Sequence, residues 1–212
     1  MSGSGADVEE RLVRDAERLG VSLSREDATR LLRLIEELAH WNRSYNLTAI
    51  KTPSAMMTHH LLDSLAVNSA LTGTRIADVG TGAGFPGLPL AVVNPARQFT
   101  LIDSVAKKLR FVAHATLLLG LDNVIPLHAR VERMHVQVPF DTVVARAFAP
   151  LPEMLTAVAP ICGPQTQVLA MKGKWPVAEL ETLPSGWQVL RSGKLLVPGL
   201  DAERCLIVLQ PA

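Results

Sequence analysis

The sequence predicts an α/β fold in which a doubly wound, mostly parallel β-sheet is preceded by a helical cap. Three observations lead to this prediction. From residue 75 onward, short apolar runs alternate with stretches long enough for helices, which is typical of parallel strands covered on both faces. The last two apolar runs are separated by only a short loop, which indicates an antiparallel hairpin at the sheet edge. Before residue 75, apolar residues recur only with helical spacing.

The cap is expected to comprise residues 1–72, with residues 1–6 as a flexible tail. Helical periodicity then runs over residues 7–46, where one face carries the apolar side chains of Leu31, Leu34, Ile35 and Leu38. A break at Thr-Pro-Ser precedes a second amphipathic stretch, residues 54–70, which carries Met57, Leu61 and Leu65. These two stretches predict a helical region that covers the sheet.

The main domain is expected to comprise residues 73–212. Five apolar runs predict the parallel strands: RIADV (75–79), QFTLID (98–103), NVIPLHA (123–129), DTVVARA (141–147) and QVLAMKG (167–173). The stretch VAKKLRFVAHATLLLG predicts a helix that ends at Gly120, because glycine favours the backbone conformation found just after helices. The segments WQVLRSGKLLVP and ERCLIVLQ predict the final hairpin.

Composition excludes several classes of protein. Hydrophobic residues make up 48 % and charged residues 19 % of the 212 residues, which is too apolar a balance for a disordered chain. The net charge of +1 means that any nucleic-acid contact must come from a local patch. Cys162 and Cys205 lie too far apart in the sequence to indicate a metal pair. No apolar run approaches the roughly 18 residues that span a bilayer. We therefore expect a cytoplasmic protein without a metal site.

A dense group of glycines follows the first predicted strand. In GTGAGFPG, Gly80, Gly82, Gly84 and Gly87 occur within eight residues, which suggests a backbone that passes close to a ligand. The spacing of the last three also satisfies the G-x-G-x-x-G pattern of dinucleotide-binding proteins. In a doubly wound sheet this turn lies at the ligand site, so a dinucleotide and S-adenosylmethionine are both candidates.

Neighbouring residues favour S-adenosylmethionine. Asp78 lies one residue inside the strand end, where a carboxylate would suit the ammonium group of a methionine moiety but not a pyrophosphate. Pro86 and Pro89 remove two backbone N–H groups that a pyrophosphate would use at the helix N-terminus. Asp103 ends the second strand and can accept hydrogen bonds from ribose hydroxyls in either ligand. Together with the terminal hairpin, these residues predict a fold of the S-adenosylmethionine-dependent methyltransferase type.

Seven motifs in order along the chain resemble those of one bacterial family. They extend over about residues 28–210 and are WNRSYNLTAI, HLLDSL, DVGTGAGFPGLPLA, LIDSVAKKLRF, ARVE, FDTVVARAF and LAMKG. The chain thus resembles the glucose-inhibited division protein B family, methyltransferases that modify a guanine at N7 in small-subunit (16S) ribosomal RNA. Relatives often carry Ser where this chain has Ala145, and the first 25 residues carry no recognisable motif.

The resemblance implies S-adenosylmethionine as cofactor, held by Gly80, Phe85, Val131, Glu132 and Arg146. With the residues chosen from the sequence itself, the expected cofactor site also includes the glycine turn and the two strand-end acids: Asp78, Gly82, Gly84 and Asp103. Phe85 would form an apolar wall. Val131 and Glu132 follow a strand, where they could bracket an adenine ring.

Cations near the strand ends are the candidates for contact with RNA. Arg146 interrupts an otherwise apolar strand, so it must reach either an internal carboxylate or a ligand, because an unpaired buried charge is costly. Lys172 ends the fifth strand on the same side of the sheet. With Arg130, Arg133 and Lys174 these residues form a predicted cationic rim, suited to RNA phosphates and the O6 edge of guanine. Arg130, Arg146 and Lys172 are the substrate-side candidates, although any one of them could be a solvated surface residue.

The implied chemistry needs no proton-transfer residue, because guanine N7 has a lone pair and no proton. We expect direct in-line attack on the methyl group without a general base, with rate enhancement from positioning and electrostatics. His59, His60 and Asp63 more readily predict packing and hydrogen bonding within the cap than a metal site. The expected enzyme is a monomer acting on ribosomal RNA within the small-subunit particle. A methyltransferase for another substrate and a non-catalytic ribosome-assembly factor remain the alternatives.

Overall fold

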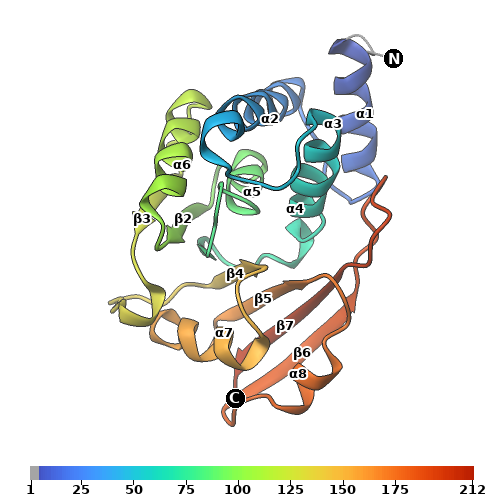
Figure 1. Cartoon of the computed structure of the whole chain (residues 1–212). Helices are drawn as coiled ribbons and strands as arrows, with labels where there is room; N and C mark the ends of the chain where they lie inside the picture. Colours follow the sequence, from blue (N-terminus) through green and yellow to red (C-terminus); the bar gives the residue numbers. More distant parts are fainter. Residues whose placement is uncertain (1–4) are drawn as a thin grey trace.

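A seven-stranded sheet with strand order β3-β2-β1-β4-β5-β7-β6 runs through the protein (Figure 1). The computed structural model describes residues 5–212. The strands are β1 (Arg75–Val79), β2 (Gln98–Asp103), β3 (Val124–His128), β4 (Thr142–Arg146), β5 (Gln167–Lys172), β6 (Trp187–Lys194) and β7 (Cys205–Pro211). β1 to β5 are parallel, whereas β7 is antiparallel to both of its neighbours, β5 and β6. The predicted strands and the terminal hairpin are confirmed.

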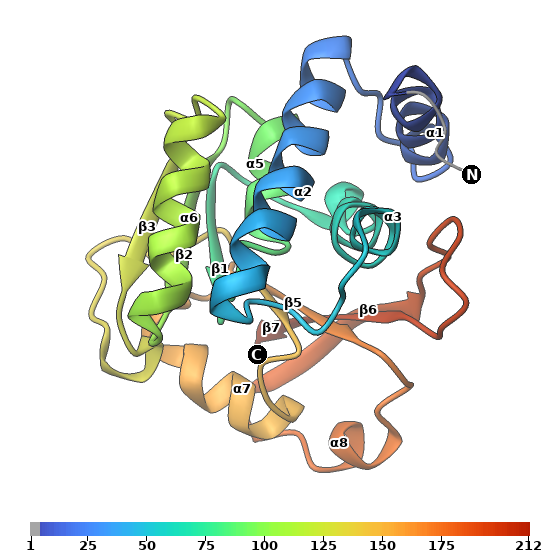
Figure 2. The ribbon, with the colours of Figure 1, turned by 45° about the horizontal axis from the view of Figure 1, so that its top comes forward.

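Helices cover both faces of the sheet, as the apolar strands require. α2 (Arg25–Tyr45), α5 (Gly87–Val93) and α6 (Ala106–Leu118) lie on one face, and α7 (Leu151–Val158) lies on the other, with the short α8 (Val177–Glu181) beyond it (Figure 2). Successive residues of one strand enter different cores: Leu169 belongs to the first and Val168 to the second. The doubly wound architecture is therefore confirmed.

The N-terminal helical region is two helices rather than one. α1 spans Gly5–Glu17, so residues 5 and 6 are helical and not part of a tail, while residues 1–4 of the predicted tail lie outside the described residues. The chain turns at Gly20, whose φ is 74°, and α2 then begins after Ser24. Ser24 and Asp27 form a reciprocal capping box. In the sequence, this capping box was the local signal that a new helix begins after Ser24.

The second part of the cap contains a wide helical turn. α3 (Pro53–Met56) leads into the π-helical segment η1 (Met57–Leu62), which continues as α4 (Asp63–Leu65) and, after a turn, the 3-10 segment η2 (Asn68–Ala70). π-helical turns inside helices are often found at functional sites. This turn carries His59 and His60 and ends next to Asp63.

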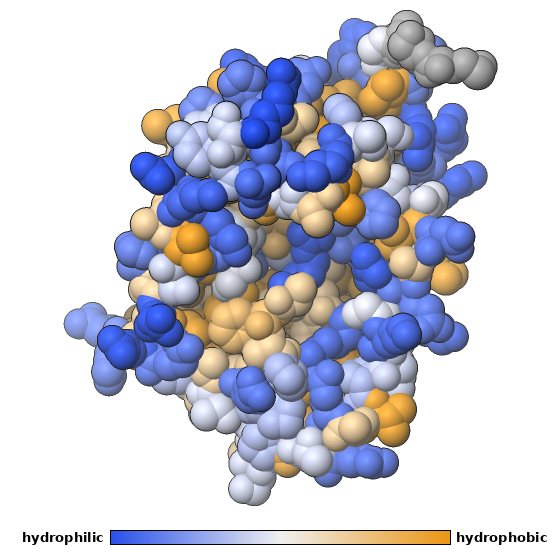
Figure 3. Space-filling model, viewed as in Figure 1, coloured by the Kyte–Doolittle hydropathy of each residue, from blue (hydrophilic) through white to orange (hydrophobic). Residues whose placement is uncertain are grey.

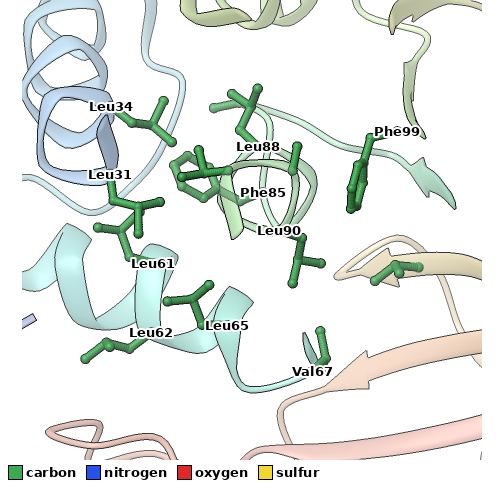
Figure 4. Close-up of a cluster of buried hydrophobic side chains, with 14 of the residues drawn as sticks. Leu31, Leu34, Leu61, Leu62, Leu65, Val67, Phe85, Leu88, Leu90 and Phe99 are labelled. Atoms are coloured by element: carbon green, nitrogen blue, oxygen red, sulfur yellow. The ribbon is translucent and has the colours of Figure 1, made fainter. Parts of the chain in front are cut away.

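Cap and sheet share one hydrophobic core. Figure 4 shows leucines of α2, η1 and α4 packed toward Leu88 of α5 and the strand residue Phe99. Leu31, Leu61 and Phe99 are fully buried. The predicted division into a cap and a main domain at residue 72 therefore stays a prediction, since the same core extends across this residue. None of the helices in the described part of the chain is both long and apolar enough to cross a membrane.

Candidate active site

Two neighbouring cavities lie where the direction of strand addition reverses, between β1 and β4. Ligands of doubly wound sheets bind outside the carboxyl ends of the strands at such a point. The larger cavity, about 500 Å³, is lined by residues of the cap, the glycine turn and the ends of β4 and β5. The smaller cavity, about 240 Å³, is lined by residues that follow β2 and β3. Gly80, Lys108 and Ala147 line both cavities. On the face seen in Figure 3, hydrophilic side chains surround a paler and more apolar middle.

The glycine turn requires glycine at two positions that face the cavities. Gly80 has a φ of +70°, and a Cβ atom added there would lie 2.5 Å from the ring of Phe148. Gly82 has a φ of +62° and lines the larger cavity, and an added Cβ atom there would meet only the carbonyl oxygen of Gly80, at 3.9 Å. Gly84 lines neither cavity, and an added Cβ atom would clash with Leu88. Gly84 was predicted to line the cofactor site, but here it packs the turn against α5.

Asp78 lies beneath the turn. Its Oδ2 atom accepts hydrogen bonds from Thr81 Oγ1 at 2.6 Å and from the backbone N–H of Gly87 at 2.8 Å. The residue is 1 % exposed and lines neither cavity. Asp78 thus holds the turn from below. Its position at the strand end had led us to expect that its side chain faces a ligand directly, and it does not. Among the described residues, its Oδ1 atom has no hydrogen-bond partner.

Burial makes Asp78 a sensitive probe of this turn. Burial raises the pKa of the carboxyl group from 3.8 to about 6, against the lowering effect of the hydrogen bonds from Thr81 and Gly87. The folded state therefore binds the proton more tightly than the unfolded chain. We expect this group to stabilise the protein by about 2 kcal/mol near pH 4 relative to pH 7, a contribution lost as the pH rises through 6. Asp78→Asn, which cannot ionise, should lack this contribution.

The measurement is urea denaturation of both proteins between pH 4 and 7. The difference in free energy of unfolding between parent and variant is the relevant quantity, because His60 acts in the opposite direction. Burial, with the nearby charge of Arg146, lowers the pKa of His60 to about 3, so acidification below 6.5 costs stability in both proteins. A parent-minus-variant difference that does not change with pH would contradict the buried, protonatable Asp78.

Helix α5 offers no free backbone donor to a phosphate. The N–H of Gly87 binds Asp78, the N–H of Leu88 binds the carbonyl of Gly84 at 2.7 Å, and Pro89 has none. A dinucleotide site needs such donors at the helix N-terminus. The contacts agree with the preference for S-adenosylmethionine that Pro86 and Pro89 suggested.

The smaller cavity brings together the residues predicted around an adenosine. Asp103 accepts hydrogen bonds from the backbone N–H groups of Gly82 at 2.9 Å and Val105 at 2.8 Å, which fix its carboxylate beside the turn. Val131 is buried, whereas Glu132 and Arg130 are exposed at the cavity wall. A carboxylate held by two N–H groups still has lone pairs for further donors.

Arg146 reaches an internal carboxylate and also lines the larger cavity. Its Nη1 atom donates to Asp63 Oδ2 and to the carbonyl of His59, both at 2.9 Å. Its Cζ atom lies 5.8 Å from the centre of the Phe85 ring, and that ring stacks on His60 at 4.8 Å. The first of the two alternatives for Arg146 therefore holds, while its side chain, 20 % exposed, remains open to a ligand.

Lys172 is not a free rim cation. Its Nζ atom donates to Glu179 Oε2 at 2.7 Å and to the carbonyl of Ala149 at 2.8 Å, although the residue lines the larger cavity. Burial alone would raise the pKa of Glu179, but hydrogen bonds from Lys172 and a backbone N–H lower it. Arg133 and Lys174 are exposed and line neither cavity. Of the predicted rim, only Arg130, the paired Arg146 and the paired Lys172 line a cavity.

Sequence reasoning missed Arg204 and Lys108. Arg204 donates from Nε to Asp63 Oδ1 at 2.9 Å, and it lines the larger cavity. Like Arg146, it adjoins an apolar strand, which was the available signal. Lys108 lies between the cavities, 4.0 Å from Asp103. Among residues 5–212, no group of three or more histidine, cysteine or acidic residues could hold a metal ion.

Comparison with known proteins assigns the family. The model of GidB, described as rRNA small subunit methyltransferase G, matches residues 27–207. Curated proteins named ribosomal RNA small subunit methyltransferase G are similar over nearly the whole chain. The protein from Methylococcus capsulatus is 48 % identical over 200 residues, which is 94 % of this chain and 97 % of that protein. The protein from Aeromonas hydrophila is 45 % identical over 188 residues, 89 % of this chain and 88 % of its own.

Solved structures are similar in fold. The chain matches TrmN from Thermus thermophilus with a TM-score of 0.56 and 22 % identity, covering 70 % of this chain and 47 % of that one. It matches a SAM-dependent methyltransferase from Aquifex aeolicus with a TM-score of 0.54 and 21 % identity, covering 78 % and 97 %. The chain therefore belongs to the rRNA small subunit methyltransferase G family, whose members are S-adenosylmethionine-dependent methyltransferases.

Proposed function

We propose that this enzyme methylates N7 of a guanine in 16S ribosomal RNA, with the adenosine of the cofactor in the smaller cavity and the target base in the larger one. The observation that carries the proposal is the pair of adjoining cavities at the switch point, which share Gly80 in their walls. The names of the relatives, which specify the small ribosomal subunit, support the choice of RNA.

The residues around both cavities fit S-adenosylmethionine. The carboxylate of Asp103 can accept hydrogen bonds from ribose hydroxyls, and the apolar side chain of Val131 can contact adenine. The buried, unpartnered Oδ1 atom of Asp78 adds negative charge behind the turn, where a cationic ligand would be favoured. Gly80 leaves space beside Phe148, because a Cβ atom at this position would clash with the Phe148 ring.

The proposed chemistry requires no general base. Bound S-adenosylmethionine supplies a methyl group on a sulfonium sulfur: the bond from N7 to carbon forms as the carbon–sulfur bond breaks, the electron pair stays on sulfur, and no proton is released. His60 lies in the wall of the larger cavity, and both of its ring nitrogens have partners: Thr48 Oγ1 at 2.9 Å and Arg146 Nη2 at 3.5 Å. Positioning of the base is then the main task of the protein.

Arg146 and Phe85 are our candidates for holding the base. The guanidinium group can donate to the O6 atom beside N7, and an aromatic ring provides an apolar contact for a purine. Arg130 and Lys172 would contact the phosphates of the flanking RNA. We further propose that the enzyme acts as a cytoplasmic monomer on the ribosomal particle.

Asp103→Ala should weaken binding of S-adenosylhomocysteine by about 10- to 100-fold, because charge-assisted hydrogen bonds of this kind contribute roughly 1.5–3 kcal/mol. The variant also frees the N–H groups of Gly82 and Val105, which loosens the turn. Calorimetric titration gives the dissociation constant. Asp122→Ala, a change at an exposed acid outside both cavities, is the control. Parent-like affinity of Asp103→Ala would remove this residue from the cofactor site.

The function itself is tested by transfer of a labelled methyl group. Small ribosomal subunits from a strain without this enzyme, total cell protein and a small-molecule extract are each incubated with the enzyme and labelled S-adenosylmethionine. We expect label in the 16S RNA alone. Label in protein or small molecules would favour a different methyltransferase, and no transfer despite cofactor binding would favour a non-catalytic assembly factor.

A further inference from the structure

One buried carboxylate joins two arginines in the wall of the larger cavity. The side chain of Asp63 is only 2 % exposed. Its Oδ2 atom pairs with Arg146 and its Oδ1 atom pairs with Arg204, each at 2.9 Å. The three residues come from the cap, the end of β4 and the residue before β7, so three distant parts of the chain meet at this carboxylate.

Each oxygen of Asp63 serves a different guanidinium group. Charge-assisted hydrogen bonds of this type are short and geometrically specific, and the low polarity of a buried site strengthens them. The trio carries one negative and two positive charges. If the carboxylate were neutral, the two guanidinium groups would be left with a mutual repulsion that nothing in the trio offsets. This repulsion favours their movement toward solvent, although Arg146 keeps its contacts with the carbonyl of His59 and the ring of His60. Their side chains are 20 % and 22 % exposed, so the cavity offers that path.

We propose that Asp63 is a positioning residue for methyl transfer: it fixes the guanidinium group of Arg146 beside Phe85 at the place where the target base binds, with Arg204 balancing its second oxygen. This inference rests on the proposed function, which places the base in the larger cavity. It differs from a purely structural tie between cap and sheet, because it requires the effect of Asp63 to pass through Arg146.

The test starts with Asp63→Asn, which keeps the shape of the side chain but removes its charge and presents a donor to one of the arginines. We expect the single-turnover rate constant for methylation of small subunits, at saturating cofactor, to fall by about 10- to 100-fold, since misplacement of a catalytic group by about 1 Å can cost that much. Asp63→Glu, which keeps the charge, should recover part of the rate. A parent-like rate of Asp63→Asn would overturn the proposal.

A double-mutant cycle separates positioning from structure. In the Arg146→Ala background, Asp63→Asn should cause little further loss, both in the rate and in the dissociation constant for S-adenosylhomocysteine. If the two substitutions lower these quantities independently, by factors that multiply, then Asp63 does not act through Arg146 and the proposal is wrong. An inactive parent enzyme would instead contradict the proposed function, so the two failures are distinguishable.

The chain offers a matched control. Asp15 is a second buried acid that pairs with two arginines, Arg11 at 3.5 Å and Arg18 at 3.3 Å. These residues lie in α1 or directly after it and line neither cavity. Asp15→Asn should lower stability without changing the methylation rate constant. Should Asp63→Asn alone fail to fold, Asp63→Asn/Arg204→Gln restores the net charge of the trio and is compared with Arg204→Gln. Equal rates in that pair would overturn the proposal.

Discussion

Gly82→Val is expected to lower the affinity for S-adenosylhomocysteine by at least about 100-fold, equivalent to roughly 2.7 kcal/mol, while the protein stays folded. Gly82 has a φ of +62°, a conformation that a β-branched side chain resists. An added Cβ atom would make only ordinary contact with the carbonyl oxygen of Gly80, at 3.9 Å, so the substitution introduces no clash at this atom. The new side chain would instead occupy part of the larger cavity and disturb the N–H that binds Asp103.

Backbone strain alone could loosen the fold, so the control must carry the same strain elsewhere. Gly120→Val provides it, because Gly120 has a φ of +60°, nothing within 4 Å of an added Cβ atom and a position just after α6 that lines neither cavity. Both variants should show similar losses in thermal stability. Titration should show a loss of cofactor affinity for Gly82→Val alone. Equal affinity of the two variants would place Gly82 outside the cofactor site.

Arg146→Ala is expected to reduce the methylation rate constant by about 100- to 1,000-fold, the range seen when a donor to the reacting group is removed. We also expect a smaller, about tenfold, loss of affinity for S-adenosylhomocysteine, because the side chain lies beside the glycine turn. Breaking a buried ion pair usually costs much stability. Here Asp63 keeps its pair with Arg204, so the variant should remain folded.

Lys172→Ala is the informative comparison for Arg146→Ala. Its ammonium group pairs with Glu179. Because we propose that it also contacts RNA phosphates, we expect roughly tenfold slower methylation at subsaturating subunits and unchanged cofactor affinity. Raising the salt concentration should mimic this change but not the Arg146 change, because salt competes with the proposed contact between Lys172 and the RNA phosphates, whereas Arg146 is proposed to donate to the uncharged O6 atom of the base. Both variants are measured by single-turnover methylation and calorimetry at two salt concentrations. A loss of cofactor affinity in Lys172→Ala as large as in Arg146→Ala would mean that both residues belong to one site.

The fold was predictable because its signals are local. Strands that are buried on both faces appear as short apolar runs, and each of the seven predicted strands is present with ends shifted by a few residues at most. The break between α1 and α2 was missed, because the helical spacing of apolar residues continues on both sides of it. Gly20 and the Ser24–Asp27 capping box mark that break locally, and they outweigh the periodicity.

The site was predictable only where it follows from the sheet topology. Asp103, Val131 and Glu132 come together because the ends of neighbouring parallel strands meet at one edge. The contact of Asp63 with Arg204 spans 141 residues of sequence and depends on how the cap packs on the sheet, which no local pattern encodes. The predicted role of Asp78 was wrong for a similar reason. Its position at the strand end was correct, but the glycine turn folds over it, and Thr81 and Gly87 donate hydrogen bonds to its Oδ2 atom.

The most direct test of the proposed reaction is the position of the methyl group. Small ribosomal subunits from a strain without this enzyme are incubated with it and S-adenosylmethionine, and the RNA is then cleaved chemically at N7-methylguanine and mapped by primer extension. We predict one new cleavage site, at a guanine of 16S RNA, that requires both the enzyme and the cofactor and is absent with Arg146→Ala. Methyl incorporation into the RNA without cleavage at any guanine would contradict N7 as the acceptor.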